Sequence, residues 1–243
     1  MSSVALVTGA SRGIGRAIAV ALAPGRAVAV NYRANAEEAK ETLRLVEAAG
    51  GEGIVVEGDV RDAASVERLF GEVEDALGAV SVLVANAGVR ADGLAARLSD
   101  DAWADVVDTN LYGTFACARR ALRPMLRAGW GRIVNVASVA GLAGNAGQAN
   151  YCAAKAGVVG LTRSLAREVA RKGITVNAVA PGLIDTDLVA SLDDQQRGDL
   201  LGSIPAGRSG TPEEVAAAVA FLCSEQAAYV TGTVLTIDGG MTA

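Results

Sequence analysis

Short runs of apolar residues alternate along this chain with longer stretches in which apolar positions recur at a helical period. The short runs are rich in Val, Ile and Ala on both faces, which is typical of strands buried within a parallel sheet. Helices between such strands would cover both faces of the sheet. We expect seven strands, at residues 3–8, 27–32, 53–58, 80–86, 131–138, 173–181 and 233–238.

The intervening stretches predict helices at 13–23, 36–49, 62–77, 99–126, 150–171 and 212–223. No linker, low-complexity tract or repeat interrupts the alternation, so residues 1–243 are predicted to form a single domain. The fold class is α/β: a doubly wound Rossmann fold, with a seven-stranded parallel sheet and helices on both faces. One long interruption, at 182–211, is expected to form a substrate lid at the carboxyl edge of the sheet.

The hydrophobic content of 51% and the mean hydropathy of +0.32 raise the question of a membrane protein. No apolar run approaches the roughly 18 residues of a spanning helix, and the start of the chain lacks the basic region of a signal peptide. We therefore expect a cytoplasmic protein with neither membrane nor nucleic acid as a partner.

Histidine is absent, which excludes the Ser-His-Asp triad, the Cys-His dyad and nearly all usual catalytic zinc sites. The three cysteines, Cys117, Cys152 and Cys223, are far apart and form no CxxC motif. They are predicted to be buried free thiols. Any proton transfer must therefore use another kind of side chain, and no metal site is expected.

The sequence VTGASRGIG lies between the first strand and the first helix. Glycines at such a turn let backbone N–H groups approach a pyrophosphate at the helix N-terminus. The spacing is GxxxGxG, and a purely structural turn is the alternative interpretation. The candidate cofactor-binding residues here are Gly9, Ser11, Arg12, Gly13, Ile14 and Gly15.

Two further motifs follow the third and fourth strands: GDV, with Asp59 and Val60, and ANAG, with Asn86, Ala87 and Gly88. Both lie where the carboxyl ends of parallel strands meet, which is where a dinucleotide lies across such a sheet. Either motif alone would indicate only an ordinary loop.

The end of the second strand distinguishes the two nicotinamide cofactors, because an acid there binds the ribose 2′-OH of NAD. Here the strand ends with Asn31, Tyr32 and Arg33, and the next acid is Glu37. Arg33, together with Arg12, can pair with a 2′-phosphate, so we expect NADPH. The alternative is that Arg33 is a solvated loop charge.

Tyr151 and Lys155 are four residues apart in a predicted helix, so they lie on one face. An ammonium group beside a phenol stabilises the phenolate and is expected to lower the pKa of Tyr151, making it a usable acid. The chain has nineteen arginines and only three lysines, and a compact ammonium with three donors differs from the planar guanidinium. Our interpretation is that this position requires the compact ammonium group of Lys155.

Two polar residues are placed to assist this pair. Ser138 ends the fifth strand and can polarise a substrate carbonyl beside Tyr151. Asn110, in the helix after the fourth strand, can hold a water that relays protons to Lys155. Taken singly, they would be read as a turn hydroxyl and a helix polar group.

Together these motifs resemble the classical short-chain dehydrogenase/reductase family, with TGASRGIG, GDV, ANAG, TN, Ser138, YxxxK and PG in the family's order. Within the family, segments such as GQANYCAAKAG and VTGTVLTIDGGM look like bacterial 3-oxoacyl-acyl carrier protein reductases. Two departures are that ANAG replaces the commoner NNAG and that RAGWGR has fewer basic residues than the fatty-acid enzymes often have.

The resemblance implies an NADPH-dependent ketoreductase with strand order 3-2-1-4-5-6-7. It implies a homotetramer built through the helices at 99–126 and 150–171 and the last strand. It assigns Tyr151 as acid, Lys155 as its modulator and ribose ligand, Ser138 as carbonyl donor and Asn110 as relay. Tyr151 also counts among the cofactor contacts, and the motif after the sixth strand adds Pro181, Gly182, Ile184 and Thr186.

The implied reaction is reduction of the 3-oxo group of an acyl thioester on acyl carrier protein, in fatty acid or polyketide-type biosynthesis. The same residues would serve an acetoacetyl-CoA reductase or another short-chain alcohol or ketone dehydrogenase, because they do not contact the acyl chain. A catalytically inactive cofactor sensor is a remote alternative, against which the complete set of four residues argues.

The formal charge of −5 is unevenly distributed, which matters for an acidic carrier protein. Residues 109–172 have a net charge of +9, and the remainder of the chain has −14. Arginines recur at helical spacing along both helices of this segment, where solvated faces or subunit contacts are one explanation. The helix ends, with Arg127 and Lys172, are expected to steer an anionic partner toward the cleft.

Overall fold

Seven parallel strands form one sheet in the computed structural model, which describes residues 3–185, 201–202 and 204–243. The strand order is β3-β2-β1-β4-β5-β6-β7, which confirms the predicted topology and fold class. The strands are β1 (Ser3–Val7), β2 (Arg26–Tyr32), β3 (Glu52–Glu57), β4 (Val80–Ala85), β5 (Gly131–Val136), β6 (Ile174–Pro181) and β7 (Val234–Ile237).

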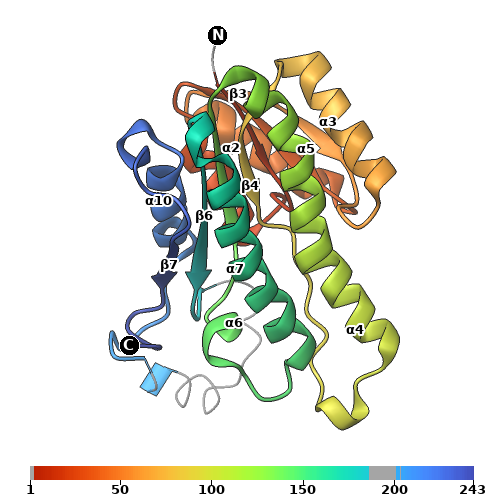
Figure 1. Cartoon of the computed structure of the whole chain (residues 1–243), viewed down its shortest axis with the longest axis vertical. Coiled ribbons are helices and arrows are strands. Elements are labelled where there is room, and N and C mark those ends of the chain that lie inside the picture. The colour runs from red at the N-terminus through yellow and green to blue at the C-terminus, as the bar shows by residue number, and fades with distance from the viewer. Residues whose placement is uncertain (1–2, 186–200, 203) are drawn as a thin grey trace.

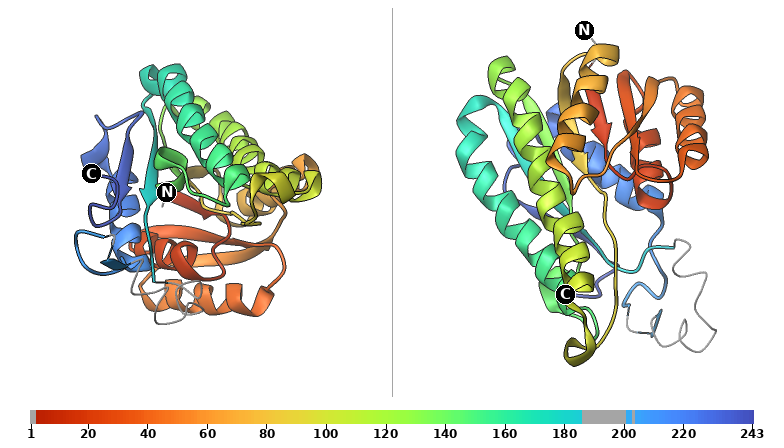
Figure 2. Two further views of the ribbon diagram at one scale, coloured as in Figure 1. Left: turned by 90° about the horizontal axis from the view of Figure 1, so that it is seen from below. Right: turned by 90° about the vertical axis from the view of Figure 1, so that its right-hand side faces the viewer.

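Helices cover both faces of this sheet, as Figure 2 shows. Their bounds are α1 (Gly13–Leu22), α2 (Ala36–Ala48), α3 (Ala63–Leu77), α4 (Asp100–Val107), α5 (Gly113–Ala128), α6 (Ala140–Ala143), α7 (Ala149–Val169) and α10 (Pro212–Leu222). The buried side chains of α1, α2 and α10 pack on one face, and those of α3, α5 and α7 pack on the other. The apolar surface of both sheet faces is thereby removed from water.

Four of the helices, α2, α3, α4 and α10, begin where a polar side chain accepts from a free backbone N–H group. Asn35 accepts from the N–H of Glu38 at the start of α2, and Asp62 accepts from two N–H groups at the start of α3. At α10 a capping box joins Thr211 and Glu214, with Pro212 in the first turn. Local sequence therefore fixes the start of these helices.

The predicted helix at 99–126 is wrong in one respect, because it contains a π-helical turn at Asp108–Tyr112 between α4 and α5. A π turn accommodates one extra residue and is frequent at functional sites. Here it includes Asn110. Helical periodicity in the sequence cannot reveal such a turn, because the apolar spacing on either side is that of an ordinary helix.

The arrowheads of β6 and β7 point toward the bottom of Figure 1, where α6 and the start of α7 are found. Because all the strands are parallel, their carboxyl ends face this same side. Most of the predicted lid, 186–200 and residue 203, lies outside the described residues. The described ends of that segment are joined, since the N–H of Asp185 donates to the carbonyl of Gly210 at 2.8 Å and Gly210 N donates to Leu183 O at 2.9 Å.

The cysteines are free, and Cys117 and Cys223 are buried as predicted. Cys152 is only partly buried, which corrects the prediction for that residue, because it lies in the first turn of α7 near the sheet edge. None of the helices in the ranges given above has the length and apolar character needed to cross a bilayer.

Candidate active site

A cleft of about 1040 Å³ opens at the carboxyl edge of the sheet, between the ends of β1, β2, β3 and β4. All twelve residues that the first four strand ends contributed to the prediction line it: Gly9, Ser11, Arg12, Gly13, Ile14, Gly15, Arg33, Asp59, Val60, Asn86, Ala87 and Gly88. Residues widely separated in the sequence thus meet in one place, as the rule for open α/β sheets requires.

The glycine loop between β1 and α1 forms a close-packed cradle. Gly9 has a φ of +61°, and a Cβ there would lie 2.8 Å from Ala87 Cα. A Cβ on Gly15 would lie 2.6 Å from the amide nitrogen of Asn86. That amide donates to the carbonyls of Thr8 at 2.9 Å and Gly9 at 3.0 Å, so β4 supports the loop. The cradle leaves the N-terminus of α1 accessible to an anion.

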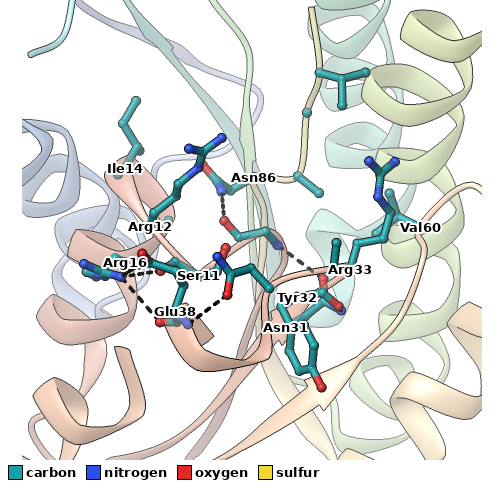
Figure 3. A pocket seen from close by; sticks show the side chains of 18 of the residues that line it. Ser11, Arg12, Ile14, Arg16, Asn31, Tyr32, Arg33, Glu38, Val60 and Asn86 are labelled. Carbon is teal, nitrogen blue, oxygen red and sulfur yellow. Dashed lines mark hydrogen bonds and ion pairs between the residues drawn. The ribbon is translucent and has the colours of Figure 1, made fainter. Parts of the chain in front are cut away.

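The end of β2 supplies the other wall of the cleft. The side-chain oxygen of Asn31, a buried residue, accepts from the N–H of Gly9 at 3.2 Å and so ties the strand to the glycine loop. Arg33 is exposed and enters the cleft from the end of β2, while Arg12 enters from the glycine loop (Figure 3). No carboxylate stands at the end of β2 itself, as the sequence indicated.

Sequence reasoning missed several lining residues: Arg16, Asn31, Tyr32, Ala34, Asn35, Glu38, Gly58, Val89, Thr109 and Asp185. Most adjoin a predicted residue, so extending each motif by a few positions would have found them. Arg16 is different, because its role is structural. It forms an ion pair with Glu38 and donates to Thr42 Oγ1 at 3.0 Å, which joins α1 to α2 beside the cleft (Figure 3).

Asp59 faces the cleft and is bound by Arg61. The guanidinium donates to both carboxylate oxygens of Asp59, with Nη2 2.6 Å from Oδ2, and also pairs with Asp105. The hydrogen bond from Arg61 is the main favourable cause that holds the pKa of Asp59 below its usual value, while partial burial opposes it. Asp59 is thus a fixed anion, and Arg33 adds a weaker attraction to it.

The predicted proton-transfer residues also meet at this edge of the sheet. Tyr151 is in the first turn of α7, and its side chain forms a hydrogen bond with Ser138, which follows β5. Lys155 lies one turn further along α7, is 3% exposed, and places Nζ 5.6 Å from the centre of the Tyr151 ring. Ser138, Tyr151 and Lys155 therefore form one cluster, as their spacing predicted.

The electrostatics of this cluster correct one prediction. Burial raises the pKa of Tyr151, and the hydrogen bond from Ser138, followed by the charge of Arg90, counteracts this in part. On balance the pKa of Tyr151 is raised, whereas we expected the pair with Lys155 to lower it. Burial lowers the pKa of Lys155 itself to about 8, and its Nζ donates to the backbone oxygen of Val136 at 2.7 Å. The depth of Lys155 beneath the sheet edge is the physical reason.

Asn110 lies in the π turn and is fully buried. Its amide nitrogen donates to the carbonyls of Val89 at 2.9 Å and Val106 at 2.8 Å. Its Oδ1 has no hydrogen-bond partner among the described residues. A buried acceptor of this kind is normally paired with a donor. A water molecule of the predicted proton relay would be such a donor, and the relay role of Asn110 stays a prediction.

The remaining predicted residues are those after β6. Pro181 ends β6, Gly182 donates its N–H to Ile237 O at 2.9 Å, and Ile184 forms a bridge with Gly210. These three do not line the cleft as it is described, nor do Tyr151 and Lys155. Thr186 lies outside the described residues. The glycine cradle and the two arginines of the cleft nevertheless fit a bound dinucleotide.

A protein family described as "Enoyl-(Acyl carrier protein) reductase" matches residues 9–242, from the glycine loop to the C-terminus. It is a branch of the short-chain dehydrogenases/reductases. The chain belongs to the short-chain dehydrogenase/reductase family. Family membership makes this protein an oxidoreductase that uses a nicotinamide cofactor.

Curated relatives of this short-chain dehydrogenase/reductase are similar to it over nearly its whole length. A 3-oxoacyl-[acyl-carrier-protein] reductase FabG of Escherichia coli (strain K12) is 48% identical over 238 residues, which cover 98% of this chain and 96% of the relative. A protein of the same name from Staphylococcus aureus (strain Mu50 / ATCC 700699) is 48% identical over 242 residues, covering 99% and 98%. The resemblance deduced from the motifs is confirmed.

Proposed function

We propose that this short-chain dehydrogenase/reductase uses NADPH to reduce the 3-oxo group of an acyl thioester, carried by acyl carrier protein, to the 3-hydroxyacyl product. The cluster of Ser138, Tyr151 and Lys155, at the edge where the cofactor cleft ends, is the observation on which the proposal rests. Two hydroxyl groups that meet at one point can both donate to a single carbonyl oxygen. The names of the relatives supply the acyl thioester.

The residues have distinct tasks in this proposal. NADPH supplies the hydride. Ser138 donates a hydrogen bond to the substrate oxygen and polarises the carbonyl, and Tyr151 gives its proton to that oxygen as negative charge develops there. Lys155, whose pKa of about 8 leaves it able to gain or lose a proton, exchanges a proton with Tyr151, and Asn110 holds the relay behind it.

We propose NADPH rather than NADH on the basis of the end of β2. Arg33 is exposed at the cleft and Arg12 faces it from the glycine loop, so two guanidinium groups line the part of the cleft in which a 2′-phosphate would bind. A carboxylate that would accept from a 2′-OH and repel a phosphate does not stand there. Gly182, Ile184 and Thr186 are proposed to contact the nicotinamide end.

Reduction of a carbon–carbon double bond is the second candidate, because the matching family is described as an enoyl reductase. The relatives that cover the whole chain have names that specify a 3-oxoacyl substrate, and we favour that reaction. Fatty acid biosynthesis is the proposed pathway, with polyketide-type synthesis as an alternative. We also propose a homotetramer in the cytoplasm, assembled through α4–α5, α7 and β7.

The test is NADPH oxidation with a matched set of substrates: acetoacetyl-carrier protein, acetoacetyl-CoA, crotonyl-CoA and simple ketones. The proposal predicts turnover of both acetoacetyl thioesters, with the carrier-protein form preferred, and little or none of crotonyl-CoA. Acetoacetyl-CoA and crotonyl-CoA differ only in the group that is reduced, so each is the control for the other. Turnover of crotonyl-CoA alone would replace the proposal by enoyl reduction.

A further inference from the structure

A second cation stands beside Tyr151. Arg90 follows the ANAG motif at the end of β4, and its guanidinium carbon lies 5.9 Å from the centre of the Tyr151 ring. That distance is within the range in which a cation is attracted to an aromatic ring. No motif in the sequence singled out Arg90, and the proton-transfer scheme above does not use it.

The position of Arg90 is fixed by a chain of contacts rather than by solvent. Its guanidinium forms an ion pair with Asp92. Both oxygens of Asp92 accept from Gln148 Nε2 at 3.1 Å, and Gln148 is itself buried and accepts from Asn145 at 2.9 Å. The cation is thus connected to the turn immediately before α7, the helix whose first turn contains Tyr151.

Backbone contacts fasten the same two segments together. Gly93 N donates to Gly147 O at 2.8 Å, and the side chain of Asn150 donates to the carbonyl of Ala91 at 3.0 Å. Asn150 adjoins Tyr151 and is fully buried. The loop after β4 and the N-terminus of α7 are therefore joined by several hydrogen bonds, which hold the guanidinium near the ring.

We infer that Arg90, clamped by Asp92 and Gln148, is a positioning residue that stabilises the phenolate of Tyr151 after its proton has left. The role of Arg90 in turnover rests on the proposed function, whereas its effect on the ionisation of Tyr151 does not. A guanidinium remains charged at any pH that the protein tolerates, whereas burial lowers the pKa of Lys155 to about 8. Arg90 thus supplies a permanent charge at the ring.

The groups that face Tyr151 come from every neighbouring element. Ser138 and Arg90 lower its pKa, and Asp92 and Cys152 raise it by their charge. Lys155 contacts the ring from the next turn of α7. Arg90 is exposed, so its side chain can be replaced while the Ser138 contact, α7 and the buried Lys155 stay in place.

The first test needs no substrate. Phenolate absorbance near 295 nm is measured against pH for each protein and for the same protein carrying Tyr151→Phe. The difference between the two curves reports the ionisation of Tyr151 alone. The titration covers the pH range in which circular dichroism is unchanged. Arg90→Met should raise the midpoint of this difference titration by ~0.5 pH unit, and Arg90→Lys should raise it less. Arg97→Met is the matched control, since Arg97 is exposed in the short helical turn that follows this loop, and it should leave the midpoint unchanged.

The second test follows the reverse reaction, oxidation of a 3-hydroxyacyl thioester, in which Tyr151 must be ionised. Arg90→Met should move the rising limb of the rate against pH by the same amount and lower kcat severalfold at neutral pH, with the dissociation constant of NADPH unchanged. A titration midpoint that does not move, or that falls, would overturn the inference. A shifted midpoint without thioester turnover would support the inference and reject the proposed function.

Discussion

Lys155 is a buried cation whose environment its neighbours in sequence do not reveal. Its amine is buried, hydrogen-bonded to the backbone oxygen of Val136, and has its pKa lowered to about 8 by that burial. In the unfolded chain the same amine has its ordinary pKa of 10.5. Between these two values the unfolded chain binds more protons than the folded protein, so this residue makes folding more favourable as pH rises.

Lys155→Met should therefore change the pH dependence of stability. We expect the free energy of unfolding of the variant, minus that of the wild type, to decrease between pH 7.5 and pH 10 by at most about 3 kcal/mol, since only the wild type loses the cost of a buried charge. Urea unfolding without nucleotide at several pH values measures this. Taking the difference removes the contribution of tyrosine and cysteine ionisation to the free energy of unfolding, because both proteins have the same tyrosines and cysteines. A difference independent of pH would show that the amine is not destabilised by burial.

Individual residues were predictable to different degrees. The pairing of Tyr151 with Lys155 follows from the period of a helix, which depends on local sequence alone. The bond from Lys155 to Val136, by contrast, depends on how α7 packs against β5, which no local pattern specifies. Arg90 was missed for the same reason, because its contact with Tyr151 joins segments about sixty residues apart in sequence.

At the scale of elements, the end of β2 bears on the choice of cofactor. Arg33→Asp should weaken NADPH binding and raise the ratio of kcat/KM for NADH to that for NADPH by about tenfold or more, because a carboxylate repels a 2′-phosphate and accepts from a 2′-OH. Arg97→Asp makes the same charge change outside the cleft and should leave the ratio unaltered. An equal ratio in both variants would mean that Arg33 is only a solvated charge.

The π turn between α4 and α5 gives a second prediction for an element. A Cβ on Gly88 would lie 2.6 Å from Asn110 Oδ1, and the fully buried Asn110 side chain is held by two carbonyls. Gly88→Ala should therefore destabilise the protein by about 1–3 kcal/mol through overpacking. Thermal unfolding measures the effect.

Gly71→Ala is the matched control for Gly88→Ala. Gly71 is inside α3, where an added Cβ would meet nothing within 4 Å. Alanine there should stabilise the protein by about 0.5–1 kcal/mol, since glycine is unfavourable within a helix. Opposite signs for the two substitutions support the packing described around Asn110, whereas a neutral Gly88→Ala would contradict it.

The elements themselves were largely predictable. Runs such as residues 4–7 are apolar on both faces, and that pattern specifies a buried parallel strand. The π turn was not predictable, because it arises where the loop after β4 offers its carbonyl at Val89 to the Asn110 amide. Residues at the four strand ends were found because the topology of parallel strands brings all of them to one edge.

At the scale of the whole molecule, the basic residues divide into two groups. Arg120 and Arg123 of α5 form ion pairs with Glu67 and Glu74 of α3, so these two arginines hold the two helices together. Arg127 and Lys172 form no ion pair within the part of the chain that the structure describes. Their helix ends are adjacent, since a Cβ on Gly173 would meet Gly129 O.

Arg127 and Lys172 lie far from the cleft toward which we expected them to steer an anionic partner. Tyr151 is in the first turn of α7 and Lys172 follows the end of that helix, about 30 Å away at 1.5 Å per residue. In Figure 1 these helix ends lie at the top, opposite the carboxyl edge of the sheet. A carrier protein bound there would reach a reaction site only across subunits, in the proposed tetramer.

Arg127→Glu combined with Lys172→Glu tests that arrangement. In the assembled protein we expect KM for a carrier-protein thioester to rise severalfold, most steeply at low salt, because unscreened charges attract an acidic partner. KM for acetoacetyl-CoA is the control and should change little. Equal losses with both substrates would indicate damage to assembly, and no loss with either would indicate a substrate that arrives without a carrier protein.

Tyr151→Phe tests the account most directly, because it removes one hydroxyl and leaves the ring beneath Arg90. The account predicts that NADPH binds within about twofold of the wild type while kcat for acetoacetyl thioester reduction falls at least a hundredfold, since the proton donor alone is lost. A variant that keeps more than about a tenth of the wild-type rate would contradict the assignment of Tyr151 as the acid.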